Sequence, residues 1–257
     1  MKAGRLAIDA PARAHPVDVV DDEGPRAWLI PRRPGRTLSA DPGGSARMHP
    51  DADVLEVDPV TGRRTGLAAY ARRVLRALGR RDVPYALVGA AALAVRGLPR
   101  MTRDVDVVVV IEDAWAALDA LEEAGFVSIT PVDRGTEPEP MYVLKDEGAN
   151  EVDVLVAAGE PESTIVAEAP TVTAFGVEAP VATLEHLVLM YLYSNQPRHL
   201  GDLARIVTDT AVDLPAVERY LSDVHPEMLP VLHERVEMAR HPAPPPPRPP
   251  RRRPTPK

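Results

Sequence analysis

The sequence contains no cysteine, few aromatic residues and no long apolar run. Cysteine is absent from its 257 residues, and Phe, Trp and Tyr together make up only 4% of them. The lack of cysteine excludes disulfide bonds and thiolate metal sites. No stretch approaches the roughly 18 apolar residues that a membrane span requires, and the first residues lack the apolar core of a signal peptide. We therefore expect a cytoplasmic protein with an aliphatic, alanine-rich core and no membrane association.

Proline and charge are unevenly distributed along the chain. Residues 1–60 are broken by Pro and Gly and show no sustained periodicity, so we expect a mostly disordered extension with one short strand at 54–57. Residues 241–257 are rich in proline and arginine, which predicts a disordered basic tail. The net charge is −8, and the five cationic residues of the tail leave about −13 for the rest. This acidity excludes a generic nucleic-acid binder, so any such contact would be local, made by a basic patch or by the tail.

Between these two ends, apolar periodicity predicts alternating helices and strands. We expect helices at 67–80, 90–96 and 113–124, the first of them capped by Thr61 or Thr65. Strands are expected at 85–88, 102–111, 126–130, 141–144 and 151–157, and further helices at 184–193, 199–208, 214–223 and 226–240. The predicted class is α+β, with a small mixed sheet flanked by helices in a core of residues 61–180 and a helical part at 181–240.

Two aspartates on an apolar strand are the most informative feature of the sequence. Asp104 and Asp106 lie two residues apart, so their side chains share one face of the strand. The valines around them predict that the strand is buried, where two adjacent carboxylates repel each other unless a cation lies between them. With no cysteine in the chain and no histidine nearby in sequence, the cation expected is Mg²⁺.

A third aspartate is the candidate that completes the cluster. Asp153 lies on another apolar, β-branched strand, and it joins the pair if this strand neighbours the first one. Three carboxylates can hold two divalent ions for in-line phosphoryl displacement. Glu151 is a competing ligand on the same face, and an ordinary surface position for Asp153 is the alternative.

Gly89 is predicted to form a turn between a strand and a helix. A glycine there lets backbone N–H groups face an anion at the start of the helix, although a plain tight turn explains the residue equally well. Four histidines of the helical segments are interpreted as surface or packing residues rather than ligands: His186, His199, His225 and His233.

From about residue 65 to residue 210, the sequence resembles the DNA polymerase β-type nucleotidyltransferase superfamily. The motifs that carry the resemblance are Gly89-Ala90, then Asp104-Val-Asp106, then the single Asp153, in the family's order. The segment from Arg100 to Arg103, and the helical segments containing Tyr191 and Asp202, are similar to a minimal bacterial branch, the AbiEii-like toxin nucleotidyltransferases. The resemblance implies the nucleotidyltransferase fold.

The resemblance also implies a metal site. Asp104 and Asp106 would hold the Mg²⁺ that carries a nucleoside triphosphate, and Asp153 would share a second ion and help to deprotonate the attacking hydroxyl. Mn²⁺ is the alternative metal.

The nucleotide-binding residues implied by the resemblance lie around this metal site. Gly89 and the backbone of Ala90 would contact the phosphates, and Arg100 and Arg103 would neutralise developing charge. Two further residues are included. Thr102 would either bind phosphate or support the loop, and Asp202 would support the site.

The activity implied is transfer of a nucleoside monophosphate from a nucleoside triphosphate (NTP) to RNA, with tRNA as one candidate, or to a protein, in a toxin-like role with a cognate antitoxin-like partner. One alternative is a small-molecule, aminoglycoside-type nucleotidyltransferase. Another is a partner-binding module of the same fold with weak or no catalysis, because the lysine that the family carries near this point is Tyr191 here. Arg100, Arg103 or Arg198 would then have to replace that lysine.

Overall fold

The computed structural model describes residues 66–148 and 150–242. The strand expected at 54–57 and the disorder expected for residues 1–60 lie outside these ranges, as does all of the proline-rich tail beyond residue 242. In the described ranges, no helix is both long enough and apolar enough to cross a lipid bilayer.

A mixed five-stranded sheet forms the centre of the fold, with the strand order β1-β2-β5-β4-β3. Only β2 and β5 pair in parallel, while β1, β4 and β3 join the sheet antiparallel. A separate two-stranded sheet is formed by β6 and β7. The strand bounds are β1 Tyr85–Leu87, β2 Asp104–Val110, β3 Val127–Ser128, β4 Met141–Lys145, β5 Glu151–Ala157, β6 Thr171–Ala174 and β7 Val177–Pro180.

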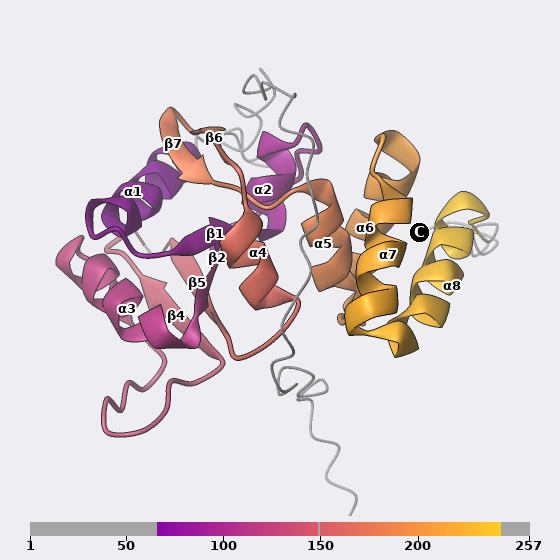
Figure 1. The fold of residues 1–257 in the computed structure, drawn as a ribbon. Helices are drawn as coiled ribbons and strands as arrows, with labels where there is room; N and C mark the ends of the chain where they lie inside the picture. Colours follow the sequence, from indigo (N-terminus) through magenta and orange to yellow (C-terminus); the bar gives the residue numbers. More distant parts are fainter. Residues whose placement is uncertain (1–65, 149, 243–257) are drawn as a thin grey trace, which may run out of the picture.

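Helices cover both faces of the sheet and then continue as a group of their own. Figure 1 shows α1 and α3 on one side of the sheet, α2 and α4 on the other, and α5 to α8 grouped beyond them. The α-helices are α1 Leu67–Arg80, α2 Gly89–Val95, α3 Ala114–Glu123, α4 Glu162–Glu168, α5 Leu184–Leu192, α6 Pro197–Asp209, α7 Leu214–Val224 and α8 Leu229–Arg240, with short 3₁₀ turns η2 Ile111–Asp113 and η3 Pro226–Met228. The expected α+β class, a mixed sheet flanked by helices and followed by C-terminal helices, is confirmed.

The core is aliphatic, and it fixes which face of β2 carries the acids. Val105, Val107 and Val109 are fully buried, and Val108 is buried on the opposite face as well. A strand buried on both faces belongs in the interior of a sheet, which is where β2 lies, between β1 and β5. Asp104 and Asp106 are therefore held on a rigid central strand.

Several expected boundaries need correction. The structure adds α4 and the β6–β7 hairpin, which were not expected, and it reduces the strand expected at 126–130 to two residues. The N-cap residue of α1 is Gly66, in the left-handed conformation, and not a threonine as expected. Thr61 and Thr65 themselves lie outside the described residues. A domain boundary near residue 180 stays a prediction.

Candidate metal and nucleotide site

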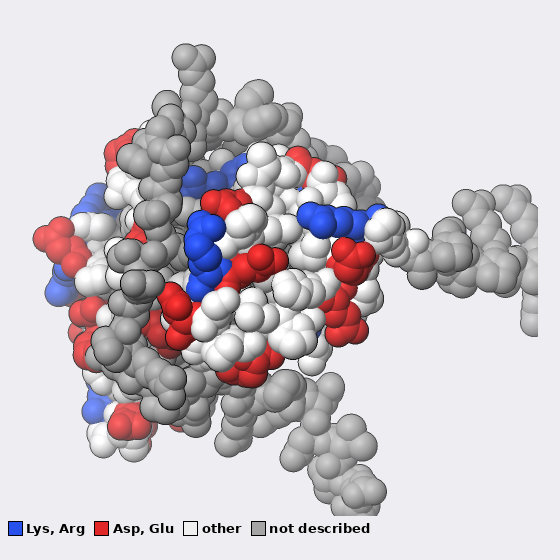
Figure 2. Space-filling view, turned by 45° about the vertical axis from the view of Figure 1, so that its right-hand side comes forward, with Lys and Arg blue, Asp and Glu red and all other residues white. Residues whose placement is uncertain are grey.

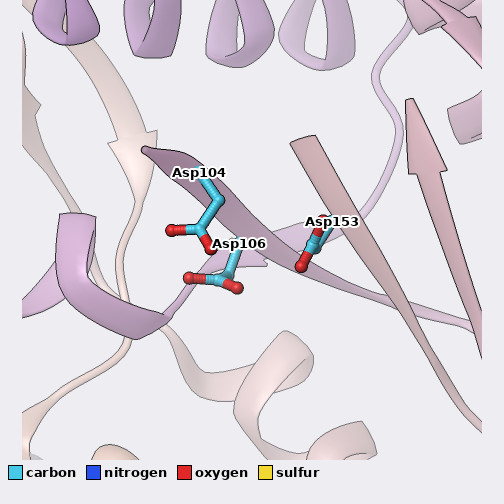
Figure 3. Close-up of side chains that lie close together, drawn as sticks. All are labelled: Asp104, Asp106 and Asp153. Atoms are coloured by element: carbon cyan, nitrogen blue, oxygen red, sulfur yellow. The ribbon is translucent and has the colours of Figure 1, made fainter. Parts of the chain in front are cut away.

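The three predicted aspartates come together on the two parallel strands. Asp106 of β2 lies directly opposite Asp153 of β5, so both side chains project from the same face of the sheet. Asp104 lies two residues before Asp106 on that face. One carboxylate oxygen from each residue lies within 4.8 Å of the other two, and Figure 3 shows the three groups converging. The condition set by the sequence, that the two strands be neighbours, is met.

Burial and mutual repulsion make this cluster costly without a cation. Burial first, and then the charges of Asp104 and Asp153, raise the pKa of Asp106 to about 7. The pKa of Asp153 is raised to about 6 by burial, with added effects of Asp104 and Glu151. Its Oδ1 atom is buried and has no hydrogen-bond partner among the described residues. An all-carboxylate donor set with an unpartnered oxygen fits Mg²⁺ or Mn²⁺.

Glu151 is the competing ligand, but it is engaged elsewhere. Its carboxylate lies 2.8 Å from the Lys145 ammonium group across the β4–β5 pair, and its side chain is 40% exposed. It lies opposite Asp104 on β5. Asp153 is therefore the better third ligand, because it carries no such ion pair and its Oδ1 is unpartnered within the part of the chain that the structure describes.

Gly89 provides the space that Asp106 occupies. Its φ is +61°, and a Cβ atom at this position would lie 1.9 Å from Oδ2 of Asp106. The preceding Val88 N–H donates to the Asp106 carbonyl oxygen at 3.0 Å. The turn into α2 therefore leaves room for the Asp106 carboxylate only because residue 89 has no side chain. Ala90 follows within α2 and is fully buried.

The loop before β2 is held by α6. The Arg100 Nε–H donates to both carboxylate oxygens of Asp202, at 2.8 and 3.0 Å, and Asp202 is only 3% exposed. Asp202 is therefore a buried partner of Arg100, and not an ordinary exposed helix acid. The Thr102 hydroxyl donates to Oδ1 of Asp104, which favours the supporting role for Thr102 over phosphate binding. Arg103 is exposed.

The start of α6 brings two further groups to the cluster, Arg198 and His199, which the sequence named without assigning them to the site. The charge of Arg198 acts on both Asp106 and Asp153 and lowers the pKa of each. His199 stacks on Tyr191 with ring centroids 5.0 Å apart, and its Nδ1 lies 2.7 Å from the Ser194 hydroxyl oxygen. Burial and the nearby arginines lower the pKa of His199 to about 4, so its imidazole is neutral at physiological pH. His199 is a packing residue, as expected, and the residue on which it packs is Tyr191 beside the cluster.

Comparisons with known proteins give only distant likenesses. No protein-family model matches the sequence, and no curated protein matches it significantly. The antibiotic-resistance factor ANT(2'')-Ia is similar in structure at 17% identity and a TM-score of 0.46, over 66% of this chain and 97% of that one. A candidate nucleotidyltransferase from Thermotoga maritima gives 16% and 0.41, over 57% and 96%. The lincosamide antibiotic adenylyltransferase LnuA gives 14% and 0.40, over 60% and 99%. We therefore argue the chemistry of the site from the residues of this chain.

Proposed function

We propose that the protein is a metal-dependent nucleotidyltransferase. The observation that carries the proposal is the cluster of Asp104, Asp106 and Asp153, three carboxylates on a buried parallel strand pair with oxygens within 4.8 Å of one another. These residues would hold Mg²⁺, or Mn²⁺ in its place, in a one- or two-metal site. When bound, the metal supplies Lewis-acid stabilisation of the phosphate charge.

The chain's own residues then have distinct roles in the transfer. The acceptor hydroxyl oxygen forms a bond to the α-phosphorus of the NTP, and the bond to the β-phosphate oxygen breaks, so that pyrophosphate leaves. Asp153 takes the hydroxyl proton, a role supported by its position directly opposite Asp106 in the cluster. Gly89 and Ala90 at the start of α2, with Arg103 beside β2, are proposed to face the phosphates. Arg100 is proposed to act chiefly through its pair with Asp202.

The acceptor is the finer part of the proposal. The expected RNA, tRNA or protein acceptor, with a toxin-like role and an antitoxin-like partner, depends on the similarity of residues 100–103, and of the helical segments containing Tyr191 and Asp202, to the AbiEii-like branch. The charge of the molecule favours a different acceptor, a cationic small molecule. The net charge of −8 carries this argument. Figure 2 shows acidic and basic side chains in separate groups on the displayed face, with no single large basic surface. Both acceptor classes therefore enter the test, and a cytoplasmic location stays a prediction.

The experiment is incubation of the full chain with Mg²⁺ and each of four α-labelled NTPs, together with total cellular RNA, with total cellular protein, or with a mixture of aminoglycosides. The Asp104→Asn/Asp106→Asn variant is the control. We expect label in one acceptor class, dependent on the aspartates and on Mg²⁺. Equal labelling by the control would refute the proposal.

A non-catalytic module with the same fold is the second candidate, and Tyr191 at the position of the family lysine is the observation that favours it. Mg²⁺-dependent NTP binding that persists with no transfer to RNA, to protein or to aminoglycosides would support this candidate over the enzyme.

A further inference from the structure

The Tyr191 side chain on α5 is buried with its polar atom unsatisfied. The residue is 3% exposed, and its hydroxyl oxygen has no hydrogen-bond partner within the described ranges. Folded proteins seldom leave a buried hydroxyl unpaired, because the group has lost its hydrogen bonds to water. An unpaired buried group in a native structure calls for an explanation, and a ligand that binds there is one.

The surroundings of this hydroxyl point to the kind of ligand. The charged side chains that act on it are all site residues: Asp202, Arg100, Asp106 and Arg198. Asp202 and Arg100 already bind each other. Arg198 is exposed and forms no ion pair with any residue that the structure describes. The Tyr191 ring also stacks on His199, the residue after Arg198, with ring centroids 5.0 Å apart. Tyr191 therefore lies beside the start of α6, next to a cation that has no ion-pair partner among the described residues.

The face of α6 that carries Arg198 is fixed by two other contacts. Arg198, Asp202 and Arg205 lie at positions i, i+4 and i+7, which is one side of a helix. Asp202 binds Arg100, and both terminal nitrogens of Arg205 lie 3.4 Å from the Pro99 carbonyl oxygen. This side of α6 therefore lies against the loop that leads into β2. Arg198, one turn before Asp202, is placed beside the start of β2, where the aspartates are.

We propose that the Tyr191 hydroxyl and the Arg198 guanidinium together bind a phosphate group of the NTP, on the α5–α6 side of the carboxylate cluster. This inference rests on the proposed function. A lysine would supply a hydrogen bond and a positive charge from one side chain, whereas here Tyr191 supplies the hydrogen bond and Arg198 the charge. Burial raises the pKa of the Tyr191 phenol, so the group stays protonated and donates its hydrogen.

The Tyr191 hydroxyl shares one feature with the aspartate cluster. Oδ1 of Asp153 is buried and unpartnered in the described chain in the same way. We expect one binding event to pair both atoms, Oδ1 of Asp153 with the metal and the Tyr191 hydroxyl with the phosphate.

Tyr193, the C-cap residue of α5, offers a matched control. Its hydroxyl is also buried and has no partner among the residues described. Because it lies two residues beyond Tyr191, it projects about 200° around the helix from it. It faces Glu162 and Glu227 rather than the aspartate cluster, and its ring packs edge-on against His225 at 5.8 Å. Replacing either tyrosine by phenylalanine removes one oxygen and leaves the ring in place.

The test is calorimetric titration of the full-length wild type, Tyr191→Phe, Tyr193→Phe and Arg198→Ala. The probes are the four NTPs and inorganic triphosphate, each with Mg²⁺. We expect Tyr191→Phe to weaken the binding of NTP and of inorganic triphosphate alike, by about 10-fold, as expected for a lost hydrogen bond to a charged acceptor. Arg198→Ala should weaken both probes by at least as much. Tyr193→Phe should bind as the wild type does, and neither tyrosine variant should lower the melting temperature of the ligand-free protein.

The outcomes separate this inference from the proposed function. Wild-type affinity in Tyr191→Phe overturns the phosphate contact and leaves the proposed enzyme intact. Equal weakening in both tyrosine variants also overturns it, since that indicates a general effect of changing α5. A wild type that binds neither the NTPs nor inorganic triphosphate overturns the inference and the proposed function together.

Discussion

Gly89 and Asp106 share a space that accommodates only one side chain. A Cβ atom on residue 89 would lie 1.9 Å from Oδ2 of Asp106, and the φ of +61° disfavours any residue with a Cβ. We expect Gly89→Ala to displace the aspartate, so that Mg²⁺ affinity is lost and the unfolding free energy falls by more than the strain alone. Calorimetric titration with Mg²⁺ and denaturant unfolding measure the two effects.

Gly66 is the control for the backbone strain. Its φ is +68°, and a Cβ there would meet no described atom within 4 Å. Gly66→Ala should therefore cost only the strain of the left-handed conformation, about 1–2 kcal/mol, with unchanged Mg²⁺ binding. If the two variants lose the same stability and both bind Mg²⁺, the contact between residue 89 and Asp106 is unimportant.

The raised carboxylate pKa values predict how the stability of the metal-free protein depends on pH. Burial first, and then the neighbouring carboxylates, raise the pKa of Asp106 from 3.8 to about 7, and that of Asp153 to about 6. Between about pH 4 and pH 7, the folded state therefore binds more protons than the unfolded state does, so this contribution to stability falls as pH rises. We expect the wild type in EDTA to lose thermal stability from pH 5 to pH 7.5 relative to Asp106→Asn. The comparison is needed because His186 and His199, whose pKa values are lowered to about 4, contribute an opposite slope in both proteins.

Two comparisons isolate this contribution. Asp106→Asn eliminates the carboxylate whose pKa is raised most, so the slope of its melting temperature against pH should be more positive than that of the wild type. Mg²⁺ favours the charged carboxylates and should stabilise the wild type most at the high end of the range. Thermal unfolding followed by circular dichroism tests both expectations, and an identical slope in the variant would contradict the first.

The residues of the site differ in how far the sequence alone could predict them. Alternation along a strand was enough to place Asp104 and Asp106 on one face. Asp153 required the β2–β5 pairing, which was stated as a condition. The roles of Tyr191 and Arg198 depend on how α5 and α6 pack against the sheet, and helical periodicity does not specify that packing.

At the scale of elements, α6 holds the loop before β2 in place through the ion pair between Asp202 and Arg100. Asp202 is buried and binds Arg100, whose side chain is 23% exposed. Removing one partner of a buried ion pair leaves the other charge buried without a partner, which destabilises the fold. Arg100 is partly exposed, so water solvates its charge and the loss of stability is smaller. We expect Asp202→Ala to lower the unfolding free energy by about 2 kcal/mol and to weaken Mg²⁺ binding, because the loop also carries Thr102.

Asp209 on the same helix is the matched control. Its carboxylate lies 4.0 Å from Arg205 and its side chain is 52% exposed. Surface pairs of this kind contribute about 0.3–0.5 kcal/mol. Asp209→Ala should thus change the unfolding free energy and the Mg²⁺ affinity only slightly. An effect equal to that of Asp202→Ala would argue against a special role for the pair between Asp202 and Arg100.

The elements that the sequence did not predict are short and have unusual boundaries. Helix α4 has only seven residues and begins with the buried Glu162, so it shows no polar-to-apolar periodicity. The β6–β7 hairpin turns at Phe175 and Gly176, both with positive φ. This geometry matches a two-residue hairpin turn, but Phe is not among the residues that favour its first position, so the turn carries no recognisable sequence signal.

At the scale of the whole molecule, the acidic character of the body bears on the choice of acceptor. The full chain carries a net charge of −8 despite its basic tail. If RNA is the acceptor, the tail should supply the attraction, since an acidic surface repels a polyanion. Deletion of residues 243–257 should then abolish RNA binding in a salt-dependent assay while leaving Mg²⁺-dependent NTP binding unchanged.

The deletion variant can also retain RNA binding. RNA binding that survives the deletion would place the RNA contact on the body of the protein. Transfer to a cationic small molecule in both forms would favour the small-molecule acceptor.

The parallel pairing of β2 with β5 joins two strands that are far apart in the sequence. Asp106 and Asp153 meet only when this long-range pairing has formed, because the segment between them contains α3, β3 and β4. Contacts of such wide sequence separation form slowly, after the loop between them has closed. A metal ion bound across the two strands would therefore add little to the rate of folding. It would instead slow the reverse step, since the strands cannot part without releasing the ion, and the lifetime of the folded chain would follow the concentration of divalent cation.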